Sequence, residues 1–589
     1  MNNRNNNYRH HNVHHNHRRR KKKSYIPRGY VYITTFILVA FLVAVGFFAV
    51  KRYAPTKEHV SLTDYYAARF DNECAVILNG KYLQDTPLPS AIMNEGKVYL
   101  ELGFVKENID SGYVYDPTEI TLRYATDKEV YTATLGSADY SIDKSNNTLS
   151  SPVLIAQNDG FFISTEYMQL LSDFQITSFS EPDRVVIETK DYDKEVTTAK
   201  KDTEIRKSNG VKSPILEDVK KGEKLNVVRV SNDKDWSVVV SEKGVIGYMK
   251  NNGFSDVKKE AVVANLPDRV YNHISLGKEV NLLWHQLKSG ASNAEIATIV
   301  ASSGNVNVMS PTWFYLNDNN GGIASFASTD YVNYCHSNNI QVWGLVSNLE
   351  NTEVDSTAVL NTTSKRDALV NNLIAQAITH GLDGINVDIE QLSGEAGDGY
   401  IQFIKELSIK CEKNDIILSV DDYVPANFNT FYNRKQQANY ADYVIIMGYD
   451  EHYSGSEEPG SVASKGWVEQ GVKDTLDEVP AEQVILGMPF YCRVWEIGED
   501  GALNSKHYGL GAIQSYMKTN GVSATWDEEL GQYYAEFTKV NTTYYIWVED
   551  EKSLEEKLKI MDKYGLAGGA FWKKGFDNEG IWNVIAKYL

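Results

Sequence analysis

Residues 383–390 read Asp383-Gly384-Ile385-Asn386-Val387-Asp388-Ile389-Glu390, with polar and apolar side chains in alternation. Successive side chains of a β-strand point to opposite faces, so Asn386, Asp388 and Glu390 share one face. Val387 and Ile389 take the other face, where they are expected to pack under helices. A row of three polar groups is costly to bury unless it has a task. The stretch therefore predicts a strand whose carboxyl end carries a polar site.

Short apolar runs alternate with helical patterns throughout residues 265–589. Eight such runs occur, at 280–284, 306–310, 342–347, 384–390, 417–421, 443–449, 484–489 and 569–572. Buried runs of this length joined by helices are typical of a parallel sheet. They predict an α/β fold in which the segment closes into a (β/α)8 barrel. The long interval 490–564 predicts an insertion between strands 7 and 8, with a hairpin at 532–539 and 543–548.

The carboxyl end of the fourth run brings two acids together. Asp388 and Glu390 would lie about 7 Å apart along a strand, at the end of the barrel where such enzymes place their chemistry. An ionised Asp388 would raise the proton affinity of Glu390. A carboxylic acid that stays protonated near neutral pH can serve as a general acid, for example toward a glycosidic oxygen.

The same run resembles the Asp-x-x-Asp-x-Asp-x-Glu signature of glycoside hydrolase family 18, the chitinase-like barrels. Asp383, Asp388 and Glu390 match it, whereas Asn386 stands where many chitinases carry an inner Asp. Later strand ends match in order, with Met447-Gly448-Tyr449-Asp450, Gly487-Met488-Pro489-Phe490-Tyr491 and Trp572. The resemblance spans about 275–589 and looks closest to the spore-cortex and cell-wall N-acetylglucosaminidase branch.

The resemblance implies a retaining hydrolysis assisted by the substrate. Glu390 would be the acid/base, Asp388 would orient the 2-acetamido group, and Tyr449 would hydrogen-bond that group. Trp572 would stack on the reacting sugar, and the expected substrate-binding residues also include Asn386, Asp383, Met447, Asp450 and Tyr491. An amide at 386 cannot titrate, so a shifted pH profile is expected. Neither a metal nor a cofactor is implied.

The amino-terminal region predicts export. Residues 1–29 hold nine basic residues and no acid, which predicts a disordered cytoplasmic tail, and residues 30–50 are uncharged. About 20 apolar residues span a bilayer, and basic residues before the span keep that end inside, so we expect a single-pass membrane protein with its body outside. A cleaved signal peptide is the competing interpretation.

Two smaller segments precede the barrel. Residues 71–190 contain a weak repeat with an offset of 63 to 65 residues, and they loosely resemble amine-oxidase-type N-terminal stalk domains, which suggests a spacer or a wall-binding unit. Residues 195–252 predict a small β-barrel that resembles bacterial SH3-type domains through Trp236 and Gly247-Tyr248-Met249. These aromatic residues could bind cell wall or simply pack.

The net charge argues against nucleic acid as a partner, and the cysteine spacing argues against a metal site. Nine of the 59 basic residues and none of the 78 acidic ones lie in residues 1–30, which leaves −28 on the rest. A body this acidic should repel nucleic acid. The four cysteines lie far apart without metal-type spacing, and a Cys335–Cys411 bridge stays possible.

Three functions remain in contention. The first is hydrolysis of bacterial cell-wall peptidoglycan, and the second is the same chemistry on chitin. The third is a sugar-binding lectin without turnover, although the presence of Glu390 disfavours it.

Overall fold

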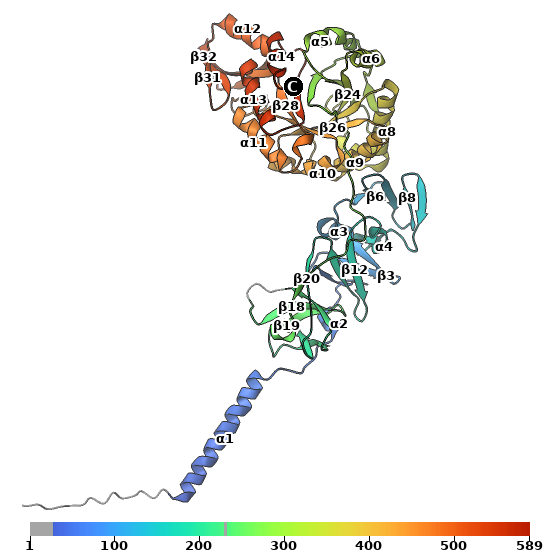
Figure 1. Ribbon diagram of the computed structural model, residues 1–589, viewed down its shortest axis with the longest axis vertical. Coiled ribbons are helices and arrows are strands. Elements are labelled where there is room, and N and C mark those ends of the chain that lie inside the picture. The colour runs from blue at the N-terminus through green and yellow to red at the C-terminus, as the bar shows by residue number, and fades with distance from the viewer. Residues whose placement is uncertain (1–26, 229–232) are drawn as a thin grey trace, which may run out of the picture.

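The computed structural model describes residues 27–228 and 233–589. Most of the predicted basic tail, and residues 229–232 of the predicted small β-barrel, lie outside the described residues. The chain is elongated, with a single long helix at one end and a large helical barrel at the other (Figure 1). Two smaller β-rich units lie between them, and the one formed by residues 193–261 lies nearer to the long helix.

The long helix α1 spans Arg28–Tyr53, and none of its residues is buried. Its mean hydropathy of 2.7 and its length are sufficient to cross a membrane. A signal sequence near an amino terminus has the same properties, so the helix alone does not distinguish an anchor from a leader.

Eight parallel strands form a closed barrel. They are β21 (Val280–His285), β22 (Val308–Leu316), β24 (Gln341–Ser347), β25 (Gly384–Asp388), β26 (Ile417–Tyr423), β27 (Tyr443–Met447), β28 (Val484–Pro489) and β34 (Gly568–Trp572). Neighbouring strands pair in this order, and β21 pairs with both β22 and β34, which closes the sheet. The predicted (β/α)8 fold is confirmed.

Two predicted strands end earlier than expected. The fourth run was expected to continue to Glu390 but stops at Asp388, and the sixth stops at Met447 instead of residue 449. Beyond Asp388 the backbone of Glu390 bonds to the Asn348 side chain and not to a neighbouring strand. Glu390 and Tyr449 therefore lie on loops just past their strands, where side chains are freer to aim at a ligand.

The barrel sheet has one apolar core on its inner face and another on its outer face. An inner core fills the barrel and includes Leu282, Trp343 and Ile445. An outer core contains Val387 and Ile389, together with the helices that cover the barrel. The covering helices are α5 (Ile296–Ser302), α6 (Thr329–Ser337), α7 (Ser356–Asn361), α8 (Thr363–His380), α9 (Gly397–Glu412), α10 (Arg434–Tyr440), α11 (Lys465–Leu476), α13 (Glu551–Lys563) and α14 (Glu579–Ile585).

The predicted insertion follows the seventh strand. It is a five-stranded sheet made of β29 (Tyr491–Ile497), β30 (Leu503–Gly509), β31 (Thr525–Asp527), β32 (Gln532–Lys539) and β33 (Thr542–Val548), with helix α12 (Leu510–Asn520). The hairpin predicted around residue 541 joins β32 and β33. Val540 and Asn541 both have positive φ, 48° and 60°, as a tight two-residue hairpin turn requires.

The segment 71–190 builds three small sheets. The predicted repeat is visible as two hairpins, β3–β4 (Ala91–Asn94, Lys97–Glu101) and β10–β11 (Leu154–Gln157, Gly160–Ser164), each followed by a short helix, α3 (Leu102–Asn108) or α4 (Thr165–Met168). The hairpins meet through an antiparallel pairing of β4 with β11. A second sheet has the order β12 (Phe174–Phe179), β13 (Arg184–Thr189), β1 (Ala75–Leu78) and β2 (Lys81–Tyr82). The third has the order β5 (Val114–Asp116), β6 (Thr121–Ala125), β7 (Val130–Thr134), β8 (Asp139–Ile142) and β9 (Ser145–Thr148).

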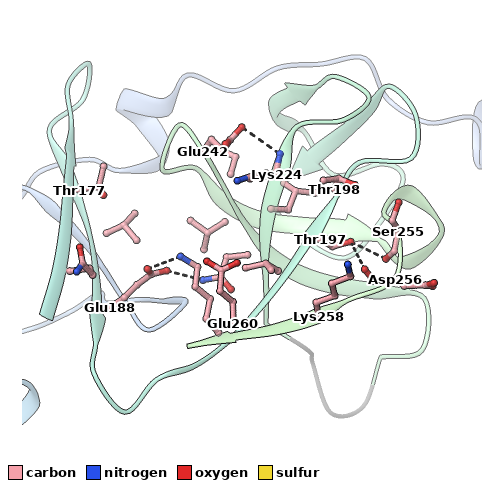
Figure 2. A pocket seen from close by; sticks show the side chains of 18 of the residues that line it. Thr177, Glu188, Thr197, Thr198, Lys224, Glu242, Ser255, Asp256, Lys258 and Glu260 are labelled. Carbon is pink, nitrogen blue, oxygen red and sulfur yellow. Dashed lines mark hydrogen bonds and ion pairs between the residues drawn. The ribbon is translucent and has the colours of Figure 1, made fainter. Parts of the chain in front are cut away.

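Residues 193–261 form one seven-stranded sheet. Its strands are β14 (Asp193–Thr198), β15 (Thr203–Arg206), β16 (Ile215–Val219), β17 (Lys224–Val228), β18 (Trp236–Ser241), β19 (Ile246–Lys250) and β20 (Lys258–Ala261). The resemblance to SH3-type domains stays a prediction. A groove of about 600 Å³ separates this sheet from β12 and β13, and Glu188 bridges it through Lys194 and Asn226 (Figure 2).

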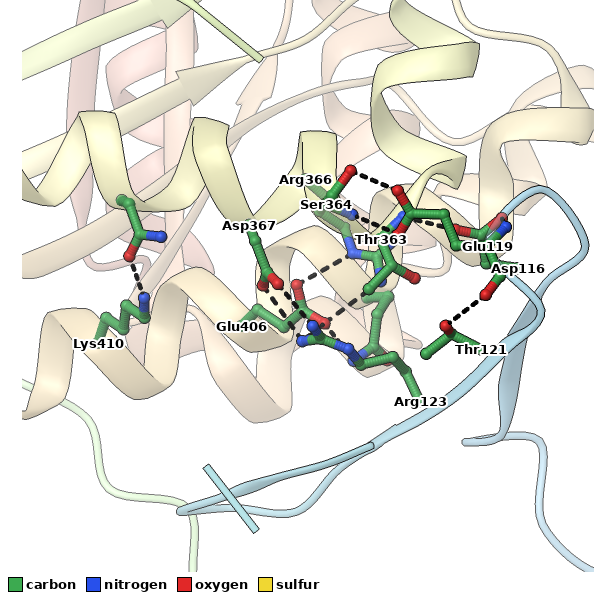
Figure 3. A network of polar contacts seen from close by, with 12 residues as sticks. Asp116, Glu119, Thr121, Arg123, Thr363, Ser364, Arg366, Asp367, Glu406 and Lys410 are labelled. Atoms are coloured by element: carbon green, nitrogen blue, oxygen red, sulfur yellow. Dashed lines mark hydrogen bonds and ion pairs between the residues drawn. The ribbon is translucent and has the colours of Figure 1, made fainter. Parts of the chain in front are cut away.

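The segment 71–190 is joined to the side wall of the barrel by a polar network (Figure 3). Arg123 of β6 (Thr121–Ala125) donates to Asp367 of α8 at 2.6 Å and to Glu406 of α9 at 3.3 Å. Arg366 is almost fully buried and donates to the same Glu406 at 3.0 Å. Although burial acts to raise it, these two cations hold the pKa of Glu406 below its usual range.

All four cysteines lie within the described residues and are buried free thiols, so the Cys335–Cys411 bridge is not formed.

Candidate active site

Asn386 lies at the centre of a polar cluster inside the barrel. Its side chain is fully buried, and its Oδ1 accepts from Trp284 Nε1 at 3.0 Å and from Ser310 Oγ at 2.9 Å. Its Nδ2 donates to Asp421 Oδ1 at 2.7 Å. Three strands, β21, β22 and β26, thus supply partners to one amide on β25. The donors on Oδ1 fix the orientation of the amide, so its N–H groups must face the acids.

Asp388 is the next inward residue along β25. Its Oδ1 is buried and finds no hydrogen-bond partner among the described residues. Burial, together with the negative charges of Glu390, Asp421 and Glu350, raises its pKa well above the usual range. A buried acceptor without a partner is unfavourable, so this oxygen is suited to accept a donor from a ligand.

Glu390 follows the strand end and is held by both of its backbone polar groups. Burial raises the pKa of its carboxyl, a hydrogen bond from Tyr423 lowers it, and the charges of Asp450 and Glu350 raise it again. The net effect is a pKa above the ordinary value. Because the acid form is favoured, Glu390 keeps its proton to a higher pH than a glutamic acid in water.

The ends of β27, β28 and β34 bring aromatic groups to the same opening. Tyr449 has its pKa raised by burial and then by the charges of Asp421, Tyr491, Asp388 and Glu390, which places its hydroxyl among the carboxyls. Its ring centroid lies 6.3 Å from that of Tyr491, whose hydroxyl donates to Asp450 Oδ1 at 2.6 Å.

Trp572 ends β34 and lies beside the buried Trp284, with ring centroids 5.8 Å apart and planes at 64°. Trp284 is almost completely buried, whereas Trp572 is partly exposed. Met447, the last residue of β27, is mostly buried in the wall of the barrel.

Asp383 lies apart from this group, and its expected contact with substrate stays a prediction. It precedes β25 at the amino end of the strand, whereas Glu390 lies past the carboxyl end. Its Oδ2 bonds to His336 Nε2 at 2.7 Å and accepts from Val342 N at 2.8 Å. Seven residues along the chain separate Asp383 from Glu390, about 20 Å if extended, and the hydrogen bonds of Asp383 support the frame of the barrel.

Three polar residues were missed from the sequence. Asp421 and Tyr423 lie on β26 beside the β25 acids, and Asn348 follows β24. A usable signal existed in the alternation of Ser419, Asp421 and Tyr423, which repeats the inward pattern of β25. Asn348 gave no such signal because its role depends on the pairing of β24 with β25.

Comparison with known proteins places this geometry in a family. The family model of glycosyl hydrolases family 18 matches residues 245–577, more than half of the 589 residues. The uncharacterized glycosylase YvbX of Bacillus subtilis is 26% identical over 284 residues, which cover 46% of this chain and 81% of that protein. The cortical fragment-lytic enzyme of Bacillus subtilis is 23% identical over 45% of this chain and 64% of its own length.

Among solved structures, the Bacillus megaterium QM B1551 spore cortex-lytic enzyme SleL aligns with a TM-score of 0.47 and 19% identity. The alignment covers 56% of this chain and 78% of that one. By the match of the family model, the chain belongs to glycosyl hydrolase family 18 and is a glycosidase.

Proposed function

We propose that this protein is a membrane-anchored glycosidase that hydrolyses β-1,4 linkages in N-acetylhexosamine polymers outside the cell, with peptidoglycan as its substrate. The observation that carries the proposal is the position of Glu390, held just past the end of β25 by the Asn348 side chain, with its pKa raised by burial. The charge of Glu390 acts on both Asp388 and Tyr449, and Trp572 ends the barrel strand β34.

The proposed reaction needs one acid and the substrate's own amide. Glu390 donates its proton to the glycosidic oxygen as the bond to the anomeric carbon breaks. The 2-acetamido oxygen of the sugar attacks that carbon and forms a cyclic oxazolinium ion, and water, deprotonated by Glu390, then opens it with retention. The leaving sugar departs with the proton of Glu390, and water restores that proton.

The other residues would stabilise the charge that develops. Asp388 would accept the acetamido N–H on its Oδ1, which has no hydrogen-bond partner in the described part of the chain, and so balance the positive ring. Tyr449 would donate to the acetamido group, and Trp572 would pack against the sugar ring. Asn386 would hold Asp421 beside Asp388 through its hydrogen bond. The hydrogen bond between Tyr491 and Asp450 would hold the side chains at the mouth of the barrel.

A group of cations beside the site favours an acidic glycan. Arg493, Lys506 and Lys573, here called the cationic rim, come from β29, β30 and the position after β34, and His507 of β30 lies beside them. Burial and then the positive charges of Arg493, Lys573 and Lys506 lower the pKa of His507, so these groups lie close together. The Nζ of Lys573 lies 5.9 Å from the ring centroid of Trp572.

A cationic rim beside the sugar-stacking Trp572 suits a polymer that carries carboxylates. Peptidoglycan has them on its peptides and on lactyl groups that carry no peptide, whereas chitin is neutral. This charge supports peptidoglycan over chitin as the substrate.

The anchor is proposed from α1 and its flanks. A span of 26 residues with no buried residue fits a bilayer, and the basic run 18–23 precedes it. Basic residues on that side favour a cytoplasmic amino terminus and an extracellular barrel. The segments 71–190 and 195–252 would then hold the barrel away from the membrane, near the wall.

The test compares the full-length protein in detergent with two matched variants. Glu390→Gln removes the acid, whereas Glu395→Gln makes the same change at an exposed position five residues on. Each protein is incubated with purified peptidoglycan and with chitin oligomers, and new reducing ends are identified by mass spectrometry. We expect peptidoglycan fragments from the wild type and Glu395→Gln only.

Other outcomes separate the alternatives. Products from chitin alone would make the protein a chitinase. Binding of either polymer without cleavage by any of the proteins would make it a lectin.

A further inference from the structure

The acids of this site differ in position from the family signature. An inner Asp is expected at 386 on the fourth strand, and this chain has an amide there. A carboxyl nevertheless lies in the same buried cluster, because Asp421 on the fifth strand bonds to that amide at 2.7 Å. The side chain of Asp421 is 3% exposed, and the charges of Glu390 and Asp422 both raise its pKa.

The pairing of β25 with β26 places the carboxyl of Asp421 next to that of Asp388. Residues 386 and 419 are register partners in the pairing of β25 with β26, so Asp421 lies two residues further along, beside Asp388. Both side chains point into the barrel, and the charge of Asp421 is one of those that raise the pKa of Asp388. Two buried carboxyls on adjacent positions of neighbouring strands titrate as a pair, because ionising one disfavours ionising the other.

The groups that face Asp421 come from three sides. Asn386, Asp388 and Glu390 approach from β25 and the loop after it, and Tyr449 approaches from the end of β27. Asp422 follows on the same strand and points the other way, to Arg434. Burial raises the pKa of Asp421 first, the hydrogen bond from Asn386 opposes this, and the charges of Glu390 and Asp422 add to it.

We propose that Asp421 is a positioning residue that replaces, from the neighbouring strand, the titrating inner carboxyl that the family signature places at position 386. Asn386 holds Asp421 in place, and the charge of Asp421 sets the pH above which Asp388 becomes the anion that balances the oxazolinium ion. The inference rests on the proposed function for its consequence in catalysis, but the paired titration of the two acids stands on its own.

Two variants test the proposal by removing the carboxyl of Asp421 or by moving it to position 386. Asp421→Asn removes the acid and keeps the shape, and the double variant Asn386→Asp with Asp421→Asn moves the acid back to β25. Ser310→Ala is the matched control, because it removes another hydrogen bond to Asn386 without changing any charge. Full-length proteins in detergent are assayed for kcat/KM on peptidoglycan fragments as a function of pH.

We expect the acidic limb of the profile to move down by about one pH unit in Asp421→Asn, because Asp388 loses a negative neighbour in a buried site. The double variant should return the limb toward the wild-type position. Ser310→Ala should lower the rate and leave the limb in place. A limb that stays in place in Asp421→Asn, with only a lower rate, overturns the proposal and leaves Asp421 a structural role.

A second readout does not depend on turnover. The infrared absorption of protonated carboxyl groups is followed with pH in the wild type, Asp421→Asn and Asp388→Asn. We expect Asp421→Asn to remove one buried titrating carboxyl and to shift that of Asp388 to lower pH. Independent titration of the two acids overturns the pairing. Should Glu390→Gln hydrolyse as fast as the wild type, the proposed function fails, while the infrared titration still decides on the pair.

Discussion

The side chain of Asn348 makes two hydrogen bonds of 2.9 Å to the backbone of Glu390, donating from Nδ2 to its carbonyl and accepting on Oδ1 from its amide. Glu390 lies past the end of β25, where the strand ladder no longer holds it. A residue after the neighbouring strand therefore fixes the position of the proposed acid.

Removing that support should lower turnover more than binding. We expect Asn348→Ala to reduce kcat by about 10- to 100-fold with a smaller change in KM, because small displacements of a reacting group are costly. Steady-state kinetics on peptidoglycan fragments measure both. Asn351→Ala, three residues along, is the control and should behave as the wild type. Equal losses in kcat for the two variants would contradict the role of Asn348.

The hydrogen bond from Tyr423 should set the basic limb of the pH profile. Activity needs protonated Glu390, so it falls as pH rises through the pKa of that acid. Tyr423 stabilises the ionised form and lowers this pKa. Tyr423→Phe should therefore move the basic limb up, by about 0.5 to 1 pH unit.

Tyr432→Phe is the control for that shift. Tyr432 donates to the carbonyl of Ile389 at 3.0 Å and not to the carboxyl of Glu390. Its loss should leave the basic limb in place, and a downward shift in Tyr423→Phe would refute the assignment.

The cationic rim should matter only for acidic substrates. Arg493→Ala removes one positive charge and is expected to reduce kcat/KM on peptidoglycan fragments several-fold, while hydrolysis of neutral chitin oligomers changes little. Raising the salt concentration should reduce the difference, because exposed charges are screened. Lys539→Ala, at an exposed turn of the same insertion, is the matched control. An equal loss on both substrates would argue against charge recognition.

The network between the segment 71–190 and the barrel should contribute to stability. Arg123→Ala leaves Glu406 with Arg366 alone and exposes a buried interface, so we expect a loss of about 1–3 kcal/mol. Urea denaturation followed by tryptophan fluorescence measures it. Lys97→Ala breaks an exposed pair with Glu166 and should cost less than about 0.5 kcal/mol.

The stability of that interface should also depend on pH. The folded pKa of Glu406 is below its unfolded value, so its contribution is present above the unfolded pKa and is lost as pH falls through the folded pKa. The denaturation midpoint of the wild type should therefore fall in acid more steeply than that of Glu406→Gln. Parallel curves for the two proteins would contradict the linkage.

An anchored protein should stay with the membrane. After alkaline carbonate extraction we expect the full-length chain in the pellet, and a chain that starts at residue 54 in the soluble fraction. Mass spectrometry of the mature protein distinguishes an anchor from a leader, because a cleaved product would lack α1.

Local sequence patterns were enough to predict the barrel strands and some of the residues of the candidate site. The two-residue alternation in 383–390 placed Asn386 and Asp388 inside the barrel, because side-chain direction in a strand depends only on position along it. The eight apolar runs predicted the parallel sheet because strands buried on both faces are apolar throughout, and the uncharged run at 30–50 predicted α1.

The residues that meet across neighbouring strands could be identified only from the tertiary structure. Asp421 and Asn348 reach the β25 acids only through the register of β24, β25 and β26, and register is set by long-range packing and not by neighbours in sequence. Asp383 matched the family signature, yet the strand carries it to the opposite end of the barrel. The docking of Arg123 on α8 and α9 joins residues more than 240 positions apart, so no local pattern could indicate it.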